Sequence, residues 1–492
     1  MKLIDLIANL SYTFMGGDLD REISAVVYDS RKVEPGCIFV CLPGAVTDGH
    51  KYAADAVSKG AAALVIQHEL DFHVPSSVTL IQVDNARLAL AELSAAWFGH
   101  PAEKLITIGI TGTKGKTTTT YMIRSILESA GLSTGLIGTI EVICGGKHTP
   151  AVNTTPESWL VQKHFADMVA AGNKYVVMEV SSQAMKLDRV SGFTFDYAIF
   201  TNLEEDHIGP GEHADMAEYI ACKGMLFQRS RVGLANAEAD YLEEVLAGHT
   251  CRLETYGMSE KADLRAVNIH RIHKSGYLGI AYDLQGLEEY PVRVDIPGDF
   301  TVYNSLAAIA LCRHLGISRE AILKALDTIQ VKGRLEIVKT PGAYTLMIDY
   351  AHNAMSLEAL LTNLRAYGPR RIICLFGCGG NRAKSRRYEM GEVSSRLADL
   401  TVVTSDNPRF EEPMDIINDI LTGVKKAPGQ YVTIPDRKQA IRYCMEIGRE
   451  GDVVLLAGKG HEDYQEIRGV KYHMDERDLI NEIIAETGMI EH

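Results

Sequence analysis

A glycine-rich segment with lysines and threonines, residues 112–118, has the composition of a phosphate-binding loop. Glycines let backbone N–H groups approach phosphate oxygens, and the N-terminus of a following helix adds the positive end of a dipole. Lys116 then supplies a charge to the β- and γ-phosphates, and Thr117 supplies a hydroxyl for Mg²⁺. The segment therefore predicts a nucleotide site, with a structural turn as the alternative.

The match to the general phosphate-loop pattern is imperfect, because Ile110 stands where that pattern has glycine and Gly109 is one place early. The flanking residues favour the nucleotide site. Residues 105–110 have the composition of a buried strand, and apolar residues at helical spacing begin at Met122 and stop at Gly131. We therefore expect a strand, a loop and a helix in that order.

Two further side chains stand where a metal ion could bind, and a lysine lies in an apolar helix. Glu179 lies in an expected strand at 175–180, where a carboxylate near a phosphate loop suits Mg²⁺. His207 follows an expected strand at 197–201, and Lys223 lies in a mostly apolar helix. On the residues alone, a solvated loop residue is the alternative for His207, and Lys223 is expected to be a snorkelling side chain.

The last third of the chain alternates short apolar strands with helical stretches, which predicts a parallel sheet. The expected strands are 345–349, 371–376, 400–404 and 452–457. A polar loop follows each of them, at 349–353, 377–382, 406–409 and 458–462. Because ligands bind at the carboxyl ends of such strands, these loops predict a ligand site at one edge of the sheet.

At 492 residues the chain is long enough for about three domains. We expect them at 1–103, 104–333 and 334–492. A small sheet at 267–295 is expected to be appended to the second domain, followed by a helix at 306–315. In the first domain, Ser30 reads as a loop residue and His50 as a surface histidine.

The composition is that of an ordinary globular protein. A net charge of -14 argues against a nucleic-acid surface, and the basic cluster at 382–387 suits a small anionic ligand better. Nine cysteines without metal-binding spacing indicate reduced, buried thiols. The sequence shows no signal pattern and no long apolar stretch, so we expect a cytoplasmic protein without membrane insertion.

Several segments together resemble conserved blocks of the Mur ligase family. They are 112–118, 153–155, 178–182, 201–203, 349–353, 458–462 and the Asp-Asn-Pro-Arg block at 406–409. The resemblance covers the whole chain, and it implies that the departure from the general phosphate-loop pattern at Ile110 is a trait of the family. It implies an α/β fold in three domains: an N-terminal domain that binds a UDP-sugar, a central parallel sheet with the phosphate loop and a small appended β-sheet, and a Rossmann-like C-terminal domain.

The resemblance also implies an ATP-dependent ligase of peptidoglycan precursor synthesis that adds the third amino acid of the peptide. The D-glutamyl carboxylate of UDP-N-acetylmuramoyl-L-alanyl-D-glutamate would attack the γ-phosphate of ATP, giving an acyl phosphate and ADP. The amine of meso-diaminopimelate would then displace phosphate. By the same analogy we expect a monomer with Mg²⁺ as cofactor, whose C-terminal domain closes as a rigid body to bring the amino acid to the phosphate loop.

Carried over position by position, the resemblance assigns roles to individual residues. Contacts to ATP fall on Gly112, Thr113, Lys114, Gly115, Lys116, Thr117, Thr118, Asn304, Arg334 and Asp349. The Mg²⁺ ligands are Thr117, Glu179, His207 and Lys223. Lys223 is expected to be carbamylated, which turns a cation into an anionic oxygen ligand. The catalytic residues are Lys116, Glu179, His207 and Lys223.

The two remaining substrates take further positions. Contacts to the UDP-substrate fall on Ser30, Asn153, Thr154, Thr155, Ser181 and Arg189. Contacts to the amino acid fall on Arg382, Asp406, Asn407, Pro408, Arg409, Gly458 and Glu462. An arginine suits diaminopimelate, because a guanidinium can grip the distal carboxylate of that substrate with two hydrogen bonds.

Some positions depart from the common family pattern. Gln183 replaces the histidine usual after the serine pair, and Asn381 stands where aspartate is common. Gln183, Lys114 and the stretch 206–213 resemble lysine-adding members, so a lysine-adding ligase is the main competing function. It would need Arg409 to point away from the pocket, since lysine lacks the distal carboxylate.

Two more functions fit the sequence less well. Folylpolyglutamate synthetase shares the ATP machinery but lacks the first domain and the Asp-Asn-Pro-Arg block. A nucleotide-binding module without catalytic activity would need neither a lysine near a metal site nor the polar loops of the C-terminal domain.

Overall fold

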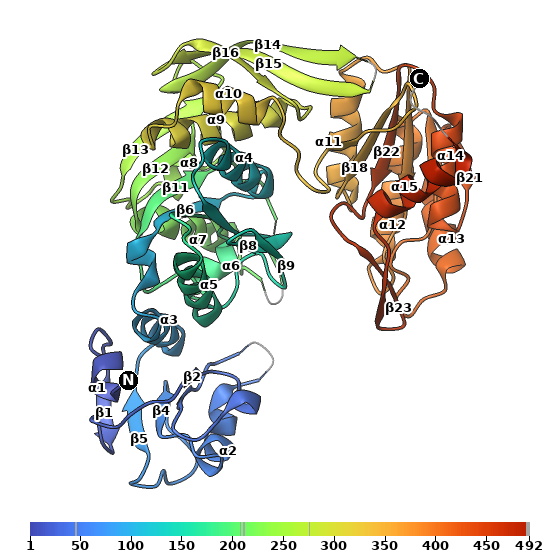
Figure 1. The fold of residues 1–492 in the computed structure, drawn as a ribbon. Helices are drawn as coiled ribbons and strands as arrows, with labels where there is room; N and C mark the ends of the chain where they lie inside the picture. Colours follow the sequence, from blue (N-terminus) through green and yellow to red (C-terminus); the bar gives the residue numbers. More distant parts are fainter. Residues whose placement is uncertain (45–46, 207, 210–211, 275, 489–492) are drawn as a thin grey trace. The chain divides into compact units, whose positions relative to one another are not determined.

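A computed structural model describes residues 1–44, 47–206, 208–209, 212–274 and 276–488 of the chain (Figure 1). The chain packs into two compact units. The first comprises Met1–Asp263 with Ala307–Ile322, and the second comprises Leu264–Leu306 with the residues from Leu323 to Gly488. No helix in the described part of the chain combines the length and the apolar composition that a membrane span requires.

The N-terminal part of the first unit is a small sheet with the strand order β1-β5-β4-β3-β2. Its strands are β1 (Thr13–Gly16), β2 (Val26–Val27), β3 (Ile38–Val40), β4 (Ala63–Ile66) and β5 (Thr79–Gln82). Its helices are α1 (Leu3–Leu6), α2 (Ala53–Ser58) and α3 (Ala86–Trp97). Buried residues of α3, among them Leu90 and Leu93, pack with Ile38, Val40 and Val65 of the sheet. This burial fixes α3 against the strands.

The expectation that His50 is a surface residue is wrong, because only 6% of it is exposed. Its ring Nδ1 lies 2.6 Å from Asp48 Oδ1, and its Nε2 accepts the backbone N–H of Gln67 at 2.9 Å. Both ring nitrogens are therefore satisfied inside the protein, which removes the main cost of burying a histidine.

The central sheet places the phosphate loop at its carboxyl edge. Within the first unit its strands run in the order β13-β12-β11-β6-β10-β7-β8-β9. They are β6 (Ile106–Thr111), β7 (Thr134–Ile137), β8 (Glu141–Cys144), β9 (Lys147–Pro150), β10 (Tyr175–Glu179), β11 (Phe195–Phe200), β12 (Ser230–Asn236) and β13 (Arg252–Gly257). Strand β6 lies between β10 and β11 and is parallel to both, so these strands end at the same edge.

The helices of this part are α4 (Lys116–Ser129), α5 (Ser158–Ala170), α6 (Ser182–Lys186), α7 (Met216–Gln228) and α8 (Leu242–Val245). The expected order of strand, loop and helix around the phosphate loop is confirmed by β6 and α4. Strand β7 ends at Ile137. Gly138 begins a turn in which its N–H bonds to the carbonyl of Glu141 at 3.1 Å, and β8 returns antiparallel to β7.

The second unit begins with the antiparallel strands β14 (Leu264–Lys274), β15 (Tyr277–Gly286) and β16 (Tyr290–Val294). Helices α9 (Asp299–His314) and α10 (Arg319–Leu326) follow in the chain, and their residues within Ala307–Ile322 belong to the first unit. The helix expected at 306–315 therefore begins earlier than predicted. The carbonyl of Gly298 accepts the N–H of Thr301 at 2.9 Å, and Asp299 complements the dipole in the first turn. Asn304 lies inside the helix rather than before it.

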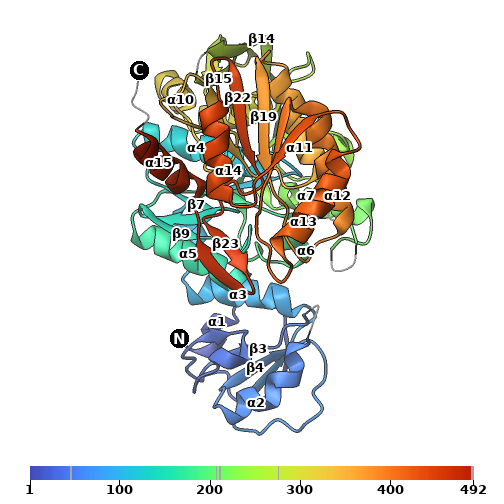
Figure 2. The same ribbon diagram turned by 90° about the vertical axis from the view of Figure 1, so that its right-hand side faces the viewer.

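The C-terminal sheet has the strand order β17-β18-β22-β19-β20-β21. Its strands are β17 (Glu336–Val338), β18 (Thr345–Asp349), β19 (Arg371–Phe376), β20 (Leu400–Val403), β21 (Gln430–Thr433) and β22 (Asp452–Ala457). All neighbours are parallel except the edge strand β17, which confirms the predicted parallel sheet. Figure 2 shows β19 and β22 side by side. A hairpin of β23 (Tyr464–Ile467) and β24 (Val470–His473) follows.

Helices cover both faces of this sheet (Figure 1). They are α11 (Ala354–Arg365), α12 (Lys384–Leu397), α13 (Pro413–Val424), α14 (Arg437–Ile447) and α15 (Glu476–Thr487). Residues of α14 and α15, such as Ile441 and Ile480, pack on one face with Ile373 and Leu456. Helices α11, α12 and α13 pack against β19 and β20. Because both faces are covered, the strands read as nearly continuous apolar runs.

Candidate active site

The phosphate loop begins where β6 ends, and its first glycine cannot be replaced without strain. Gly112 has φ of +144°, and a Cβ there would lie 2.0 Å from Thr201 Oγ1. The next residues are held by the end of β11: Asn202 accepts the N–H of Thr113 with its carbonyl and the N–H of Lys114 with Oδ1, both at 2.9 Å. The loop conformation is therefore built into the sheet edge.

Two lysines meet at the carbonyl of Gly112. Lys116 Nζ donates to it at 2.8 Å, and Lys223 Nζ donates to it at 2.9 Å from helix α7. Lys223 is only 2% exposed, and burial together with repulsion from Lys116 lowers its pKa well below the ordinary lysine value. The fold therefore places Lys223 next to the phosphate loop, as its predicted role requires.

Glu179 faces the same loop from the end of β10, next to Ile110 of β6. It is buried, and its Oε2 accepts hydrogen bonds from the hydroxyls of Thr117 at 2.9 Å and Thr139 at 3.0 Å. Oε1 accepts the backbone N–H of Thr139 at 2.8 Å. A hydroxyl and a carboxylate are hard oxygen donors, so Thr117 and Glu179 fit Mg²⁺. The further predicted ligand His207 lies outside the described residues.

Residues predicted to bind the UDP-substrate gather beside Glu179. Thr155 Oγ1 donates to the carbonyl of Glu179 at 2.8 Å and accepts the N–H of Ser181 at 3.1 Å. Arg189 Nη1 donates to the carbonyl of Thr155 at 3.1 Å. Thr154 Oγ1 lies 3.0 Å from Thr139 Oγ1, which joins it to the same hydroxyl network.

Two residues of this predicted group lie apart from that network. Asn153 is exposed. Ser30 lies in a short 3-10 helix, Ser30–Lys32, and its carbonyl accepts a hydrogen bond from Lys59 Nζ at 3.0 Å. The N-terminal part nevertheless contacts this region, since Asn85 Nδ2 donates to Asp188 Oδ2 at 2.9 Å.

In the second unit, two of the predicted nucleotide residues meet at the end of β18. Asp349 accepts the backbone N–H groups of Leu335 and Ala351, both at 2.8 Å. Desolvation raises the pKa of Asp349, and the nearby Arg334 opposes that rise. The guanidinium of Arg334 stacks 4.7 Å from the ring centroid of Tyr350. Asn304, the third residue, is buried in α9.

A cavity of about 140 Å³ lies at the carboxyl ends of β18, β19, β20 and β22. It is lined by Tyr350, His352, Gly377, Cys378, Gly379, Arg382, Arg386, Asp406, Asn407, Arg409, Gly458 and Glu462. The predicted ligand edge of the sheet is therefore a pocket to which all of the polar loops contribute. Within it, Asn407 Nδ2 donates to Glu462 Oε2 at 2.9 Å.

Arg409 faces this pocket in a conformation that the β23 hairpin imposes. Its φ is +54°, its N–H bonds to the carbonyl of Glu466 at 3.0 Å, and its carbonyl accepts the N–H of Arg468 at 2.7 Å. The guanidinium donates from Nε to Glu466 Oε2 at 3.0 Å and from Nη1 to the carbonyl of Gly380 at 2.7 Å. Backbone and side chain are thus both held in place.

The loop after β19 is held by Arg387, whose side chain is only 1% exposed. Arg387 binds both carboxylate oxygens of Glu411 at 2.7 and 2.8 Å, and Glu411 in turn accepts the N–H of Asn381. The hydrogen bonds from Arg387 lower the pKa of Glu411 to about 2. Asn381 has φ of +55°, a region that asparagine tolerates better than most residues. Arg382 beside it is exposed at the pocket rim.

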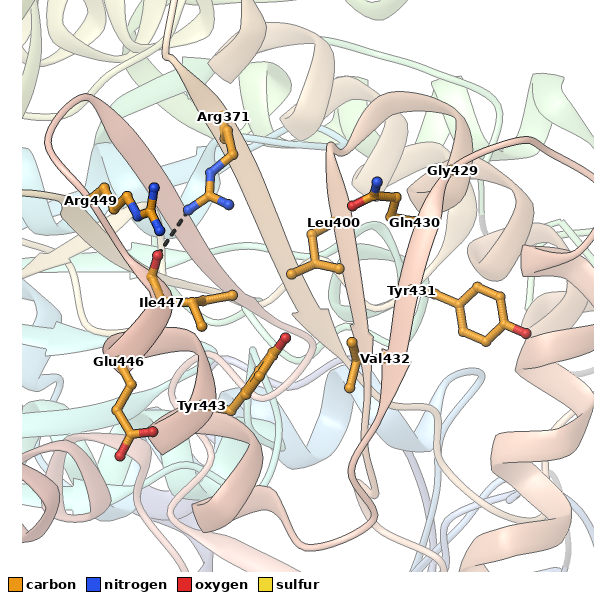
Figure 3. Close-up of a pocket in the computed structure, with 10 residues that line it drawn as sticks. All are labelled: Arg371, Leu400, Gly429, Gln430, Tyr431, Val432, Tyr443, Glu446, Ile447 and Arg449. Atoms are coloured by element: carbon orange, nitrogen blue, oxygen red, sulfur yellow. Dashed lines mark hydrogen bonds between the residues drawn. The ribbon is translucent and has the colours of Figure 1, made fainter.

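A larger cavity of about 670 Å³ lies at the opposite end of the same sheet (Figure 3). It is lined by the first residues of β19 and β20, Arg371 and Leu400, and by Tyr443 and Arg449. Arg371 is already engaged there, with the carbonyl of Ile447 at 2.9 Å and with Asp452 at 2.6 Å. Because ligands of open α/β sheets bind at the carboxyl ends, we do not assign a substrate to this cavity.

Among the described residues, Asp48, His50 and His68 form a group with the composition of a metal site. His50 Nε2 accepts a backbone N–H, so its Nδ1 must carry the proton that it donates to Asp48. His68 faces the other oxygen of Asp48 with Nε2 at 2.8 Å and a backbone carbonyl with Nδ1. His50 then offers no lone pair to a cation. Both nitrogens of His68 face acceptors, and these hydrogen bonds raise the pKa of His68 and favour the protonated ring, so the group is a hydrogen-bonded cluster.

Models of Mur ligase domains match successive parts of the chain. The model described as the Mur ligase family catalytic domain matches residues 22–98, the middle-domain model 110–312 and the glutamate ligase domain model 333–460. A protein of Clostridium acetobutylicum named UDP-N-acetylmuramoyl-L-alanyl-D-glutamate--2,6-diaminopimelate ligase 1 is 42% identical over 489 residues, which cover 99% of this chain and 100% of that protein. The chain belongs to the Mur ligase family.

Another relative and two solved structures are similar to the chain as well. A diaminopimelate ligase of the same name from Clostridium perfringens is 40% identical over 491 residues, 98% of this chain and 99% of that protein. A solved structure titled as a UDP-N-acetylmuramoyl-L-alanyl-D-glutamate--2,6-diaminopimelate ligase has a TM-score of 0.73 at 25% identity, covering 99% of each chain. A folylpolyglutamate synthase of Mycobacterium tuberculosis shares the fold, with a TM-score of 0.58 at 17% identity.

The Mur ligase fold of this chain also uses residues that the sequence did not single out. Thr139 links Thr154 to Glu179. Arg387 belongs to the basic cluster that was expected to suit an anionic ligand, but its buried guanidinium is paired with Glu411 and Asp419 and supports the loop after β19. Lys459 lies between two residues that were given roles, Gly458 and Glu462, and is completely buried. The only sequence signal for these residues is their position within or next to loops that follow strands.

Proposed function

We propose that the chain is an ATP-dependent amide ligase that joins meso-diaminopimelate to UDP-N-acetylmuramoyl-L-alanyl-D-glutamate in the cytoplasmic synthesis of the peptidoglycan precursor. The observation that carries the proposal is the composition of the small C-terminal pocket, where Asp406 and Glu462 line the same cavity as Arg409. Diaminopimelate offers ammonium groups to the carboxylates and a carboxylate to the guanidinium. Relatives that are 40–42% identical over nearly their whole length carry this activity in their names.

In this proposal each domain takes one substrate. Residues 1–103 bind the UDP-sugar, 104–333 bind ATP and 334–492 bind the amino acid. The UDP-substrate extends to the hydroxyl network around Thr155, Ser181 and Arg189. The nucleotide contacts the phosphate loop, Asn304, Arg334 and Asp349.

The reaction begins when an oxygen of the D-glutamyl carboxylate attacks the γ-phosphorus and the bond to ADP breaks. Lys116, fixed by two carbonyls of its own loop at 2.8 and 3.0 Å, neutralises charge on the transferring phosphoryl group. Mg²⁺ held by Thr117 and Glu179 supplies further charge neutralisation when bound. The amine nitrogen of diaminopimelate then attacks the acyl carbon, phosphate leaves with the electrons of the C–O bond, and the nitrogen loses a proton.

We propose that Lys223 is carbamylated. Its nitrogen attacks the carbon of CO₂, an N–C bond forms and a proton leaves, which gives an anionic carbamate. The buried contact of the two lysine nitrogens with the carbonyl of Gly112 supports this, because the depressed pKa of Lys223 favours the neutral amine that attacks CO₂ and a carbamate would be attracted to Lys116. The carbamate would offer oxygen to a second Mg²⁺ together with His207. Rescue of a Lys223→Ala variant by a short carboxylic acid tests it, and no rescue would contradict it.

The function is tested by measuring phosphate release while each substrate is omitted in turn. We expect release only when ATP, the UDP-substrate and meso-diaminopimelate are all present. Phosphate release that does not depend on the amino acid would contradict the proposal. The absence of phosphate release in the complete mixture would favour a nucleotide-binding module without catalytic activity. A lysine-adding ligase would require Arg409 to point away from the pocket. Arg409 lines the cavity, which favours diaminopimelate.

A further inference from the structure

Lys459 lies directly behind the amino-acid pocket and uses its whole hydrogen-bonding capacity inside the protein. It follows β22, and none of it is exposed. Its Nζ lies 3.0 Å from Asn407 Oδ1, 3.1 Å from Glu462 Oε2 and 3.3 Å from Asp406 Oδ1. An ammonium group has three N–H bonds, so each one has an acceptor. Lys459 therefore acts on the substrate through these three side chains and not by contact.

All three acceptors line the pocket, and they come from two different loops. Asn407 Oδ1 accepts from Lys459 and from the backbone N–H of Glu466 at 2.9 Å, while Asn407 Nδ2 donates to Glu462. The amide can satisfy these partners in one orientation only, because Lys459 and the N–H of Glu466 are both donors. Lys459 and the N–H of Glu466 together fix the orientation of the Asn407 amide in the pocket.

The backbone brings Lys459 to this position through two glycines in left-handed conformations. Gly458 has φ of +106° and Gly460 has φ of +52°, and a Cβ at Gly460 would lie 2.6 Å from Tyr350 Cβ. Below the loops, the buried Arg437 donates to the carbonyls of Ser405 at 3.0 Å and Ala457 at 3.2 Å. The ends of β20 and β22 are therefore tied together at the backbone as well.

The charges of the cluster give it a net value of -1, since one ammonium group faces the two carboxylates of Asp406 and Glu462. Such a site attracts an ammonium ion and tolerates burial better than two unpaired carboxylates would. Other titratable or charged groups also face these carboxylates: Tyr350, His352, Cys378, Arg437 and Tyr464. Lys459 is the cation that reaches both carboxylates and the amide directly.

We propose that Lys459 is a positioning residue for the incoming amino acid, which sets the arrangement and the charge of Asp406, Asn407 and Glu462 and thereby the affinity for a substrate ammonium group. This inference rests on the proposed function, and deepens it by assigning the recognition of the amine to a buried lysine that does not touch the substrate.

The test compares full-length wild type with Lys459→Met and Lys459→Gln in steady-state phosphate release. We expect the KM for meso-diaminopimelate to rise at least about tenfold in both variants, because the hydrogen bonds of charged groups are lost. The KM values for ATP and for the UDP-substrate should stay within about twofold of wild type.

Arg371→Met is the matched control. It also breaks a pair with a buried carboxylate, that of Asp452, but at the amino ends of the same strands. It should lower the melting temperature without changing the KM for diaminopimelate. A similar kinetic change in this control, equal changes in all three KM values, or an unchanged KM in folded Lys459→Gln would overturn the inference. Absence of diaminopimelate-dependent release in wild type would overturn the proposed function, and the inference with it.

Discussion

The phosphate loop and the amino-acid pocket both lie at the carboxyl edges of parallel sheets, but they are held by different kinds of interaction. The phosphate loop is held by backbone groups and short side chains, such as the carbonyl and amide of Asn202 against the N–H groups of Thr113 and Lys114. The pocket is held by long, buried cations that reach across loops. Arg387 binds Glu411, and Lys459 binds Asp406, Asn407 and Glu462.

The two sites therefore differ in how readily their ligand specificity can change within the same fold. A loop fixed by its own backbone tolerates few substitutions, because a side chain at Gly112 would meet Thr201 at 2.0 Å. A pocket fixed by ion pairs between loops can change its ligand when one partner is exchanged. We therefore expect changes at the phosphate loop to abolish the reaction, and changes at the pocket to alter affinity and selectivity.

The largest effect is expected for Lys116→Met. The variant loses the ammonium group aimed at the phosphates, so kcat should fall by about 10²–10³-fold or more. The melting temperature should stay close to that of wild type, because the hydrogen bonds from Lys116 to the carbonyls of Gly112 and Thr113 lie within its own loop. ADP release measures the effect. A kcat within tenfold of wild type would show that the phosphate loop does not take part in the chemical step.

A smaller effect, confined to one substrate, is expected for Arg409→Ala. Loss of a charged hydrogen-bonding partner of the distal carboxylate should raise the KM for meso-diaminopimelate by about 10–100-fold. The KM for ATP should not change. Arg468→Ala is the control, because Arg468 also has a positive φ and lies in the turn between β23 and β24 but is largely exposed. An equal loss in both variants would show that Arg409 acts through the fold and not through the substrate.

A pH-dependent effect on stability is expected for Glu411→Gln. Arg387 holds the pKa of Glu411 at about 2, below the ordinary value of 4.5, so the pair stabilises the folded state above about pH 4.5. That contribution is lost as the pH falls toward 2. At pH 7 the variant should be less stable by about 1–3 kcal/mol, and the difference should shrink at pH 3.

Thermal unfolding at several pH values measures this difference. Glu412→Gln, at an exposed neighbouring carboxylate, is the control and should show no pH-dependent difference from wild type. A constant difference between wild type and Glu411→Gln across the pH range would show that the carboxylate charge contributes nothing.

The smallest effect is expected for Glu466→Gln. The neutral amide can still accept from Arg409 Nε, so the guanidinium should keep its place while losing a charged partner. We expect a change of only a few-fold in the KM for meso-diaminopimelate, measured by phosphate release. A loss as large as that of Arg409→Ala would mean that the charge of Glu466, rather than its position, determines recognition.

The sequence predicted the strands and loops of both sites because their signals are local. The apolar runs of β18, β19 and β22 agree with the expected bounds, and the loop after each strand lines the pocket as expected. Edge elements were missed for a physical reason. Strand β9 is fully exposed and β21 is half exposed, so neither carries the apolar pattern by which strands are recognised.

The buried ion pairs could not be predicted from the sequence. Lys459 lies 53 residues from Asp406 in the chain, and Arg437 lies 39 residues from its partner Glu476. A lysine in a Gly-Lys-Gly loop looks like a solvated residue until the fold places carboxylates around it. The positions of Gly458 and Glu462 were inferred from a family motif, whereas the lysine that organises them is visible only in three dimensions.

The most direct test of the central claim is the ratio of kcat/KM for meso-diaminopimelate to kcat/KM for L-lysine in the wild-type enzyme, measured by phosphate release in the presence of ATP and the UDP-substrate. Because Arg409 lines the pocket beside Asp406 and Glu462, the account predicts a clear preference for meso-diaminopimelate, on the order of 10–100-fold or more. A preference for L-lysine would contradict the assignment of Arg409 and of the pocket that holds it.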